Sequence, residues 1–390
     1  MKVLHLIPSI ALVRGGPSIA VIEMVKSLRN TDIDAEIVTT NDDGDVLLDV
    51  PLNKLHEYQQ VPVRFFARFS PSIHAVREFA FSPSLTAWLW QHLQDYDLLH
   101  VHAIFSYPST IAMAIARIKN IPYITSPHGL LCEWSLQQNY RKKKLYLNLI
   151  ERKNLFSAKV VHLTAKQEKE ELELSKLNLR SIIQPLGLDM PRLISDGRQQ
   201  LHQILSIPLQ TPVILFLSRL HPKKGLDYLI PALAKLQDQN FAFVLAGKGT
   251  AEYEAEVDRL VQQNRLSDRT YKLGFVSGEK KNICLQGADL YALTSHSENF
   301  GVAVLEALAS GTPALVTKGV ALSDLVKEQS LGWVVDLEVN AIANSIQDFL
   351  SNLDVAKQKG DQAARYVAEH YTWDKTALNL KSIYENILLS

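Results

Sequence analysis

The sequence has few cysteines and no excess of charge of either sign. Cys132 and Cys284 are the two cysteines in 390 residues, and their separation argues against a disulfide framework or a thiolate metal site. Lys and Arg together number 41, as do Asp and Glu, so the formal net charge is zero. A nucleic-acid-binding protein would normally carry a basic excess. We therefore expect a protein of a reducing compartment with no nucleic-acid partner.

Long hydrophobic runs are also missing. The apolar start of the chain is broken by His5 and Pro8 and is too short for a secretory signal. No apolar run approaches the roughly 20 residues that cross a bilayer. These absences predict a cytoplasmic protein, although attachment to a membrane surface stays open. The length exceeds the size at which one hydrophobic core usually stops growing, which predicts two domains.

Short apolar runs alternate with longer helical patterns along the whole chain. Strands are predicted at 2–7, 35–39, 98–102, 123–126 and 160–163, and again at 213–218, 242–246, 270–273, 290–293 and 314–317. This alternation is typical of an α/β protein with parallel sheets, which bind ligands beyond the carboxyl ends of their strands. Four prolines between 185 and 212 indicate the change of domain.

A loop with two glycines follows the first predicted strand. Gly15 and Gly16 precede Pro17 and a helical pattern. Glycines let the backbone approach a ligand closely, and the free N–H groups at a helix start attract phosphate. A tight turn with Pro17 at the first helical position is the alternative. The loop lacks the G-x-G-x-x-G pattern, which argues against a nicotinamide enzyme.

Two cations follow the first strand of the second half. Arg219 and Lys224 lie in the segment 218–225, between a predicted strand and a predicted helix. Cations at such a place can neutralise a diphosphate without metal and stabilise its departure as a leaving group. A solvated basic loop explains the same residues equally well.

The segment 297–313 places two acids around a glycine. Glu298 falls in a loop that Gly301 lets bend, and Glu306 falls about one turn into the next helix, with seven residues between the two acids. Carboxylates accept hydrogen bonds from sugar and ribose hydroxyls, and N–H groups near Gly301 and Val302 can point at phosphate. Glu306 could instead be an acid favoured by the helix dipole. Glu298 could instead be a catalytic nucleophile.

These features resemble one family. Glu298 and Glu306 resemble the E-x7-E motif of retaining GT-B glycosyltransferases, the glycogen-synthase-like and sucrose-synthase-like group (family four). The Gly-Gly loop, the 218–225 loop and the run Glu306–Pro313 are similar too. The resemblance implies two facing Rossmann-like domains with a deep cleft between them. It implies an acceptor-binding domain at 1–190 and a donor-binding domain at 191–372. A C-terminal helix of about 373–390 can pack back on the first domain.

The resemblance also implies roles for particular residues. Arg219 and Lys224 would bind the diphosphate, and Glu306 would hold the ribose. The donor sugar and its phosphates would contact Glu298, Asn299 and the backbone of Phe300–Gly301–Val302. The remaining implied donor contacts are Gly15 and Gly16 at the distal phosphate, Phe275 and Val276 at the base, and Gly247.

Several histidines are further candidates for the site, and the chain departs from the family pattern at one position. His128, in Ser126–Gly129, matches a family histidine that reaches the sugar and the phosphate. His5, His100 and His102 are interpreted as structural, with one of the last two facing the cleft, and His162 is unassigned. The family often has Asn-Gly-x-Asp at the domain connection, where this chain has Leu186 before Gly187. This departure removes a polar side chain from that position.

Three charged segments have simple structural interpretations. The cluster Arg141–Lys144, and Arg64 and Arg68 near Phe65, Phe66 and Phe69, could touch an anionic membrane or a lipid-linked acceptor. A solvated helix start and core aromatics explain them more simply. The acids of Asn41–Asp45 are expected in a solvated, turn-rich loop.

Together with this resemblance, the sequence predicts a metal-independent glycosyltransferase with no cofactor. The resemblance implies that it is retaining and that His128, Arg219, Lys224 and Glu298 are its catalytic residues. The favoured donors are UDP-glucose and UDP-N-acetylglucosamine, with GDP-mannose as the main competitor. The acceptor is expected to be a glycan or a lipid-linked molecule in polysaccharide or glycoconjugate synthesis. A nucleotide-sugar isomerase or epimerase on a similar fold, and a non-catalytic nucleotide-sugar-binding protein, are the alternatives.

Overall fold

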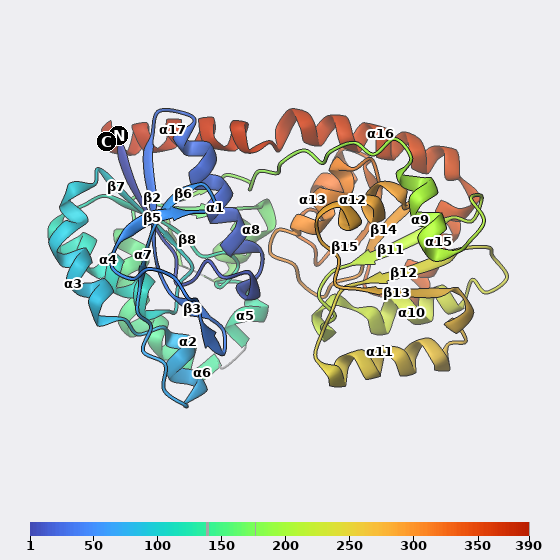
Figure 1. Ribbon diagram of the computed structural model, residues 1–390, viewed down its shortest axis with the longest axis horizontal. Helices are drawn as coiled ribbons and strands as arrows, with labels where there is room; N and C mark the ends of the chain where they lie inside the picture. The colour runs from blue at the N-terminus through green and yellow to red at the C-terminus, as the bar shows by residue number, and fades with distance from the viewer. Residues whose placement is uncertain (138–139, 176, 390) are drawn as a thin grey trace. The chain divides into compact units, whose positions relative to one another are not determined.

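Two parallel sheets organise the chain, each within its own structural unit. The computed structural model describes residues 1–137, 140–175 and 177–389. Unit 1 comprises Met1–Gly187 and Trp373–Ser390, and unit 2 comprises Leu188–Thr372. The chain thus leaves unit 1 after Gly187 and comes back at Trp373 (Figure 1).

Unit 1 contains an eight-stranded sheet in the order β10-β9-β8-β7-β1-β2-β6-β5. Its strands are β1 (Lys2–Leu6), β2 (Asp34–Thr40), β5 (Leu55–Tyr58), β6 (Val61–Phe66), β7 (Leu98–His102), β8 (Tyr123–Ser126), β9 (Val160–Leu163) and β10 (Ser181–Ile183). Neighbouring strands are parallel except for the antiparallel pair β5 and β6. A short antiparallel hairpin joins β3 (Asp42–Asp43) to β4 (Val46–Leu47).

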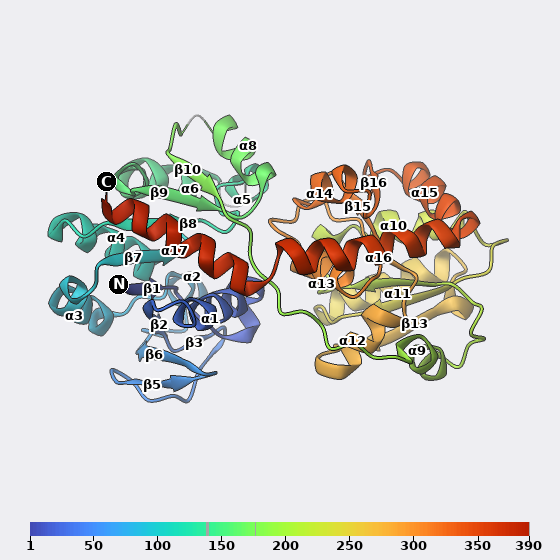
Figure 2. The same ribbon diagram turned by 90° about the horizontal axis from the view of Figure 1, so that it is seen from above.

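Helices connect the strands of unit 1. They are α1 (Gly16–Arg29), α2 (His74–Phe79), α3 (Pro83–His92), α4 (Tyr107–Lys119), α5 (Glu133–Gln137), α6 (Tyr140–Tyr146), α7 (Arg152–Ser157), α8 (Lys166–Leu174) and α17 (Trp373–Leu389). A π-helical turn, Leu147–Glu151, joins α6 to α7. The red α17 lies along α1, so the end of the chain packs on the unit in which the chain begins (Figures 1 and 2).

Unit 2 contains a six-stranded parallel sheet in the order β13-β12-β11-β14-β15-β16. The strands are β11 (Val213–Leu217), β12 (Ala242–Ala246), β13 (Thr270–Gly274), β14 (Leu290–Leu293), β15 (Ala314–Thr317) and β16 (Gly332–Val335). The helices are α9 (Gly197–Leu205), α10 (Leu226–Ala234), α11 (Ala251–Gln263), α12 (Gly278–Gly287), α13 (Val302–Ala309), α14 (Ser323–Glu328), α15 (Val339–Ser351) and α16 (Leu353–His370). This strand order is that of a doubly wound Rossmann sheet.

Burial of the central strands explains the parallel arrangement. All five residues of β7 and of β12 are buried, as expected when helices cover both faces of a sheet. Each sheet also has a point where its strand order reverses. It lies between β1 and β7 in unit 1 and between β11 and β14 in unit 2. Ligands of open α/β sheets bind beyond the carboxyl ends of the strands at such switch points.

The connection at Gly187 shows why its residue must be small. A Cβ atom there would lie 2.6 Å from the Cα of Trp373, at the start of α17. The preceding Leu186 is buried, with 4% of its surface exposed. The apolar residue at the family's asparagine position therefore packs inside the protein, and the glycine allows α17 to begin against it.

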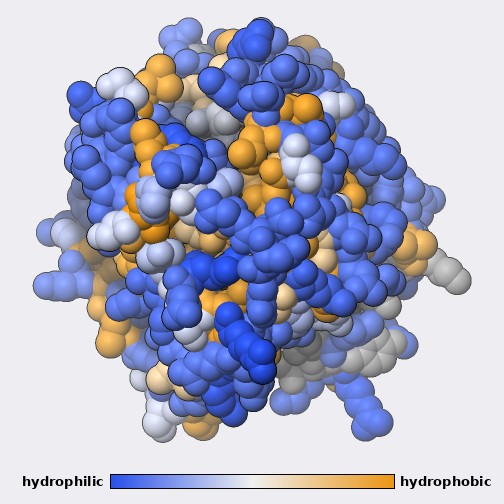
Figure 3. Space-filling model, turned by 90° about the vertical axis from the view of Figure 1, so that its right-hand side faces the viewer, coloured by the Kyte–Doolittle hydropathy of each residue, from blue (hydrophilic) through white to orange (hydrophobic). Residues whose placement is uncertain are grey.

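In the described part of the chain, no helix combines the length and apolarity needed to cross a membrane. The face of the molecule in Figure 3 is mostly hydrophilic, with apolar side chains in small separated areas. Apolar residues exposed singly are normal on protein surfaces.

Candidate functional site

Two loops meet at the switch point of unit 2. One follows β11 and runs from 218 to 225, and the other follows β14 and runs from 294 to 301. The backbone N–H of His296 donates to the carbonyl of Lys223 at 2.9 Å. The Thr294 hydroxyl donates to the carbonyl of Gly225, also at 2.9 Å. These contacts fix the two loops to each other at the carboxyl ends of neighbouring strands.

Gly225 allows this close approach. Its φ of 68° lies in the left-handed region, and a Cβ atom would lie 1.9 Å from the carbonyl oxygen of Thr294. Both the backbone conformation and the lack of space exclude a larger residue. The chain can therefore turn from Lys224 directly into α10 while it touches the second loop.

Lys224 and Glu298 form an ion pair across the two loops. Their side chains are 11% and 22% exposed. The backbone of Glu298 is bonded on both sides to the segment after β15: its N–H donates to Gly319 at 2.8 Å, and its carbonyl accepts from Ala321 at 3.0 Å. The pair therefore places one fixed positive and one fixed negative charge at the switch point.

Arg219 adds a second cation whose charge is not neutralised locally. It is exposed, and among the described residues it makes no hydrogen bond or ion pair. Burial, and then the positive charges of Arg219 and Lys224, lower the pKa of His221. Arg219 and Lys224 thus act electrostatically on the same imidazole, which supports their predicted proximity.

Glu306 lies on α13 and pairs with a residue that the motif did not predict. Lys281, on α12, donates to its carboxylate at 2.7 Å. Both Glu306 and Glu298 act on the buried Tyr291. Burial, and then the negative charges of Glu298 and Glu306, raise the pKa of Tyr291. The Tyr291 hydroxyl donates to the carbonyl of Leu217, at the end of β11. Both predicted acids therefore lie around one phenol at the switch point.

The backbone between the two acids forms the start of α13. Gly301 has a φ of 87° and is the N-cap of α13, so the first N–H groups of that helix have no partner within the helix. Asn299 is half-buried and Phe300 is buried, with 3% of its surface exposed. The backbone at Gly301 and Val302, and not the Phe300 side chain, is therefore available to a ligand.

The residues predicted for the base lie further along the sheet. Phe275 and Val276 follow β13, two strands away from β11, which corresponds to about 10 Å. Phe275 is 70% exposed and Val276 is 7% exposed. Gly247 follows β12, between these residues and the diphosphate candidates, and its N–H donates to the carbonyl of Gly274 at 2.7 Å.

In unit 1, the glycine loop follows β1 at that sheet's switch point. Gly15 is the N-cap of α1 with a φ of 88°, and a Cβ atom on Gly15 or Gly16 would meet nothing within 4 Å. Arg14 anchors the loop through Asp42, at 2.6 Å, and Glu78, at 2.8 Å. The open space beside the glycines and the start of a 14-residue helix fit the predicted approach of phosphate.

The structure decides two interpretations of charged segments in unit 1: the solvated loop expected at Asp42 is wrong, and the core interpretation of Phe65 and Phe66 is confirmed. Asp42 is not in a solvated loop: it is 3% exposed and binds Arg14 and Arg68. Arg68, Phe65 and Phe66 are not part of a surface that could touch a membrane, because each is at most 3% exposed. Burial of an arginine requires a paired carboxylate, which explains why Asp42 is also inside.

His128 occupies a strained turn directly after β8. Its φ is 50° and that of Gly129 is 75°, and the N–H of Leu130 donates back to Pro127 at 3.2 Å. Glu168, on α8, accepts from the N–H of Gly129 at 2.8 Å. Burial raises the pKa of Glu168. Non-glycine residues with positive φ cluster at functional sites, where surrounding contacts hold them.

His128 adjoins a group of histidines inside the sheet of unit 1. His5, His100, His102 and His162 are fully buried. Burial lowers the pKa of His5 and of His128 to about 3 and that of His162 to about 4, and it lowers the pKa values of His100 and His102 well below 6.5. All five imidazoles are therefore neutral near pH 7, and His100 and His102 are both inside the core.

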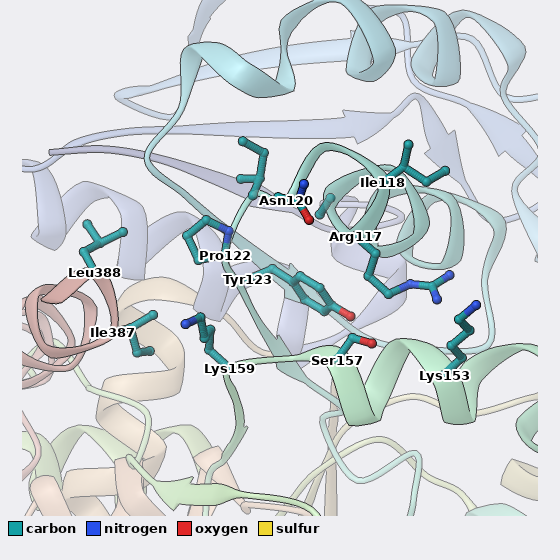
Figure 4. Close-up of a pocket in the computed structure, with 12 residues that line it drawn as sticks. Arg117, Ile118, Asn120, Pro122, Tyr123, Lys153, Ser157, Lys159, Ile387 and Leu388 are labelled. Atoms are coloured by element: carbon teal, nitrogen blue, oxygen red, sulfur yellow. The ribbon is translucent and has the colours of Figure 1, made fainter. Parts of the chain in front are cut away.

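A pocket of about 800 Å³ lies at the opposite end of the unit 1 sheet, where β8 begins at Tyr123 (Figure 4). Arg117, Lys153 and Lys159 line it together with Ile387 and Leu388 from α17. These three cations make no hydrogen bond or ion pair through their side chains within the described residues. None of the predicted site residues lines this pocket.

Comparison with known proteins adds two family matches. Residues 15–178 match the family described as glycosyl transferase 4-like domain, and residues 197–366 match glycosyl transferases group 1. A D-inositol 3-phosphate glycosyltransferase of Corynebacterium urealyticum is 26% identical over 79% of this chain and 76% of its own. An uncharacterized glycosyltransferase of Methanocaldococcus jannaschii is 32% identical over 175 residues, so the match spans 44% of each chain.

Solved structures share the fold across the whole chain. Sucrose-phosphate synthase from Thermosynechococcus elongatus has a TM-score of 0.80 at 21% identity, with both chains covered completely. Anabaena HepE, solved in complex with UDP and glucose, has a TM-score of 0.76 at 21% identity over 99% of this chain and 100% of its own. At this level of identity the likeness establishes the fold.

Proposed function

Since the chain belongs to the GT-B glycosyltransferases of the family-four type, we propose that it transfers a hexose or N-acetylhexosamine from a nucleotide diphosphate sugar with retention of anomeric configuration. UDP-glucose and UDP-N-acetylglucosamine are the favoured donors, and the solved HepE complexes with UDP-glucose and with UDP support a uridine donor. GDP-mannose is the main competitor.

The observation that carries this proposal is the convergence of charges at the switch point of unit 2. Arg219 and Lys224 supply two cations, and Glu298 and Glu306 supply two acceptors around the end of β11. Breaking the bond between sugar and diphosphate leaves extra negative charge on the leaving group. Cations fixed in place stabilise that charge in the transition state without reorganising, and one such group contributes about 10²- to 10³-fold in rate.

Lys224 has a further consequence for donor binding, because Glu298 neutralises it in the free protein. An incoming diphosphate adds negative charge beside the lysine, and the sugar hydroxyls offer Glu298 new donors. We propose that the donor therefore takes over both halves of this ion pair. On this view the reaction needs neither metal nor cofactor, because the cations supply the charge.

His128 is the proposed contribution of unit 1. It contacts the sugar or phosphate of the donor, as the family resemblance implies, while Gly15 and Gly16 offer backbone N–H groups to the distal phosphate. No double-displacement nucleophile is required when the leaving phosphate itself accepts the proton of the acceptor. The anomeric configuration of the product, read by NMR, decides between retention and inversion.

A glycan or lipid-linked acceptor at the inner membrane surface is the proposed setting. Arg141, Lys142 and Lys144 are exposed, and Leu145 and Leu149, one and two turns further on, are 61% and 72% exposed. Basic and apolar side chains together on one helical segment fit an anionic membrane. Anionic vesicles should bind the protein, and replacing Lys142–Lys144 by Ala should release it. Unchanged binding would remove the membrane contact from the proposal.

The donor proposal is tested by a thermal-shift screen against UDP-, GDP-, ADP- and TDP-sugars, followed by detection of the released nucleoside diphosphate with candidate acceptors. A stabilising donor should lose its effect in Lys224→Ala and keep it in Lys357→Ala, whose lysine is exposed on α16. Conversion of the donor without any acceptor would favour the isomerase alternative. Stabilisation without turnover would favour a binding protein.

A further inference from the structure

Four buried histidines of unit 1 and the half-buried His128 form two separate hydrogen-bonded chains. In the first, the His5 Nδ1 lies 3.1 Å from the His102 Nε2, and the His102 Nδ1 lies 3.1 Å from the His128 Nε2. The rings are nearly parallel, with interplanar angles of 17° and 16°. This first hydrogen-bonded chain of histidines therefore runs from the centre of the sheet to the turn at the carboxyl end of β8.

The second chain links His100, His162 and Tyr384. The His162 Nε2 lies 2.7 Å from the carbonyl oxygen of Gln184, its Nδ1 lies 3.3 Å from the His100 Nε2, and the His100 Nδ1 lies 2.7 Å from the Tyr384 hydroxyl. A carbonyl can only accept a hydrogen bond, so His162 must carry its proton on Nε2. His100 then donates from Nε2, and Tyr384 donates to His100. The protons of this chain have one neutral arrangement, and it does not include His128.

The first chain has two neutral arrangements that differ in direction. If the protons point inward, His128 donates from Nε2 and the chain ends on an N–H at His5 Nε2. If they point outward, His5 donates from Nδ1, His102 donates from Nδ1, and His128 accepts at Nε2 and carries its own proton on Nδ1. In a neutral imidazole, the bond made at one nitrogen thus decides the state of the other.

The inner end of the chain selects between the two directions. The His5 Nε2 is buried and has no partner among the described residues. The inward arrangement would leave an unpaired N–H there, and the outward one leaves only an unpaired lone pair. Buried N–H groups without a partner are the rarer case in proteins. At the outer end, the His128 Nδ1 makes no hydrogen bond with the described residues and is not among their buried unpaired atoms, so either state can be solvated.

We propose that His5 and His102 are positioning residues that hold His128 as the neutral tautomer with its proton on Nδ1, so that it presents a hydrogen-bond donor to the oxygen of a bound donor substrate. The consequence for catalysis rests on the proposed function, and the assignment of the tautomer does not. Because burial disfavours the charged imidazolium, the donor has to come from a neutral ring. A neutral N–H is suited to a sugar hydroxyl or phosphate oxygen and takes no proton away from the reaction.

The tautomer of His128 can be measured directly by ¹⁵N NMR on histidine-labelled protein near pH 7.5, with His128 assigned by its loss in His128→Asn. The wild-type spectrum should show His128 protonated on Nδ1. His102→Phe removes both nitrogens of the middle ring while keeping its bulk, and His128 should then shift towards the Nε2-protonated form. Tyr384→Phe is the matched control: it breaks the second chain and should leave the His128 tautomer unchanged.

Kinetic measurements distinguish a role of His102 in positioning His128 from a role in folding. In His102→Phe, and in the milder His102→Gln, kcat should fall roughly tenfold or more while the KM for the donor changes less, because one oriented hydrogen bond is lost. Circular dichroism should show the fold retained in at least one of the two variants. Tyr384→Phe should keep kcat within about twofold of wild type.

Three results would overturn the proposal. One is a wild-type His128 protonated on Nε2, and another is an unchanged His128 tautomer in both His102 variants. The third is a stoichiometric metal in the purified protein that is lost in His102→Phe, because the ring nitrogens of His5, His100 and His102 lie within 4.8 Å of one another and could bind an ion instead. If His128 is protonated on Nδ1 but no nucleotide sugar is bound or transferred, the proposed function fails and the tautomer assignment stands.

Discussion

Mild acid should destabilise unit 1, because its buried histidines resist protonation in the folded state. Burial lowers the pKa of His5 to about 3 and that of His162 to about 4, against 6.5 for an exposed histidine. Below pH 6.5 the unfolded chain therefore binds protons that the folded chain does not. The free energy of unfolding must then fall as the pH falls, and the contribution of these histidines is fully present only above pH 6.5.

The size of the effect follows from these two residues. Each loses about 1.4 kcal/mol of stabilisation per pH unit below the unfolded pKa, so each loses about 2 kcal/mol between about pH 7.5 and about pH 5. Together they remove about 4 kcal/mol, which is a large share of the roughly 5–15 kcal/mol that stabilises a typical domain. His100, His102 and His128 shift in the same direction and add to the loss.

Urea unfolding followed by tryptophan fluorescence across this pH range would measure the effect. Four of the five tryptophans, Trp88, Trp90, Trp134 and Trp373, belong to unit 1. A control variant, His74→Asn, removes a histidine whose side chain is 73% exposed and should keep the wild-type pH dependence. An unfolding midpoint that is the same at about pH 5 and about pH 7.5 would refute the reasoning, because it would require the buried rings to protonate as readily as exposed ones.

Three further predictions concern unit 2. Lys224→Ala should lower kcat by about 10²- to 10³-fold with the fold retained, as judged by circular dichroism, and near-normal turnover would contradict its role. Gly225→Ala should lower the free energy of unfolding of unit 2 by about 3 kcal/mol or more, because its Cβ meets the Thr294 carbonyl; an unchanged urea midpoint would show that the two loops can separate at little cost. Excess EDTA should leave turnover intact, and loss that magnesium restores would refute metal independence.

The sequence predicts five of the six strands described in unit 2, all but β16, because their signals are local. Apolar runs define β11 and β14, and the residues that follow them, Arg219, Lys224 and Glu298, are fixed by position along the chain. Parallel strands place such residues at one edge of a sheet whatever the details of packing. The spacing of these residues resembles that of a known family, and this resemblance indicates which chemistry they carry out.

The contacts between residues that are far apart in the sequence depend on strand order and pairing, which no local pattern shows. Lys281 meets Glu306 from another helix, and Glu168 reaches the His128 turn from 40 positions further along. The pairing of His5 with His100 follows from β1 lying beside β7. The alternation in His100-Val101-His102 does indicate that both rings lie on one face of their strand, and this signal could have raised a histidine cluster as a candidate.

The sequence does not predict the antiparallel edge of unit 1, formed by β5 and β6, for a different reason. Pro62 and Arg64 interrupt the apolar residues of β6, and β5 contains His56 and Glu57, so neither strand has the continuous apolar run of a buried parallel strand. Pro62 comes just before Val63, where the pairing of β6 with β2 begins, and proline is tolerated near the start of a strand. The hydrophobic pattern there is too weak to predict a strand from sequence.

Calorimetric titration of UDP and UDP-glucose into wild type, Lys224→Ala and Lys357→Ala tests most directly whether the charges beside β11 and β14 hold a nucleotide diphosphate sugar. Wild type and Lys357→Ala should bind with similar affinity, and Lys224→Ala should bind at least tenfold more weakly, as expected for the loss of one charge-assisted contact of about 1.5–3 kcal/mol. Equal affinity in all three proteins would place the nucleotide elsewhere and contradict the account.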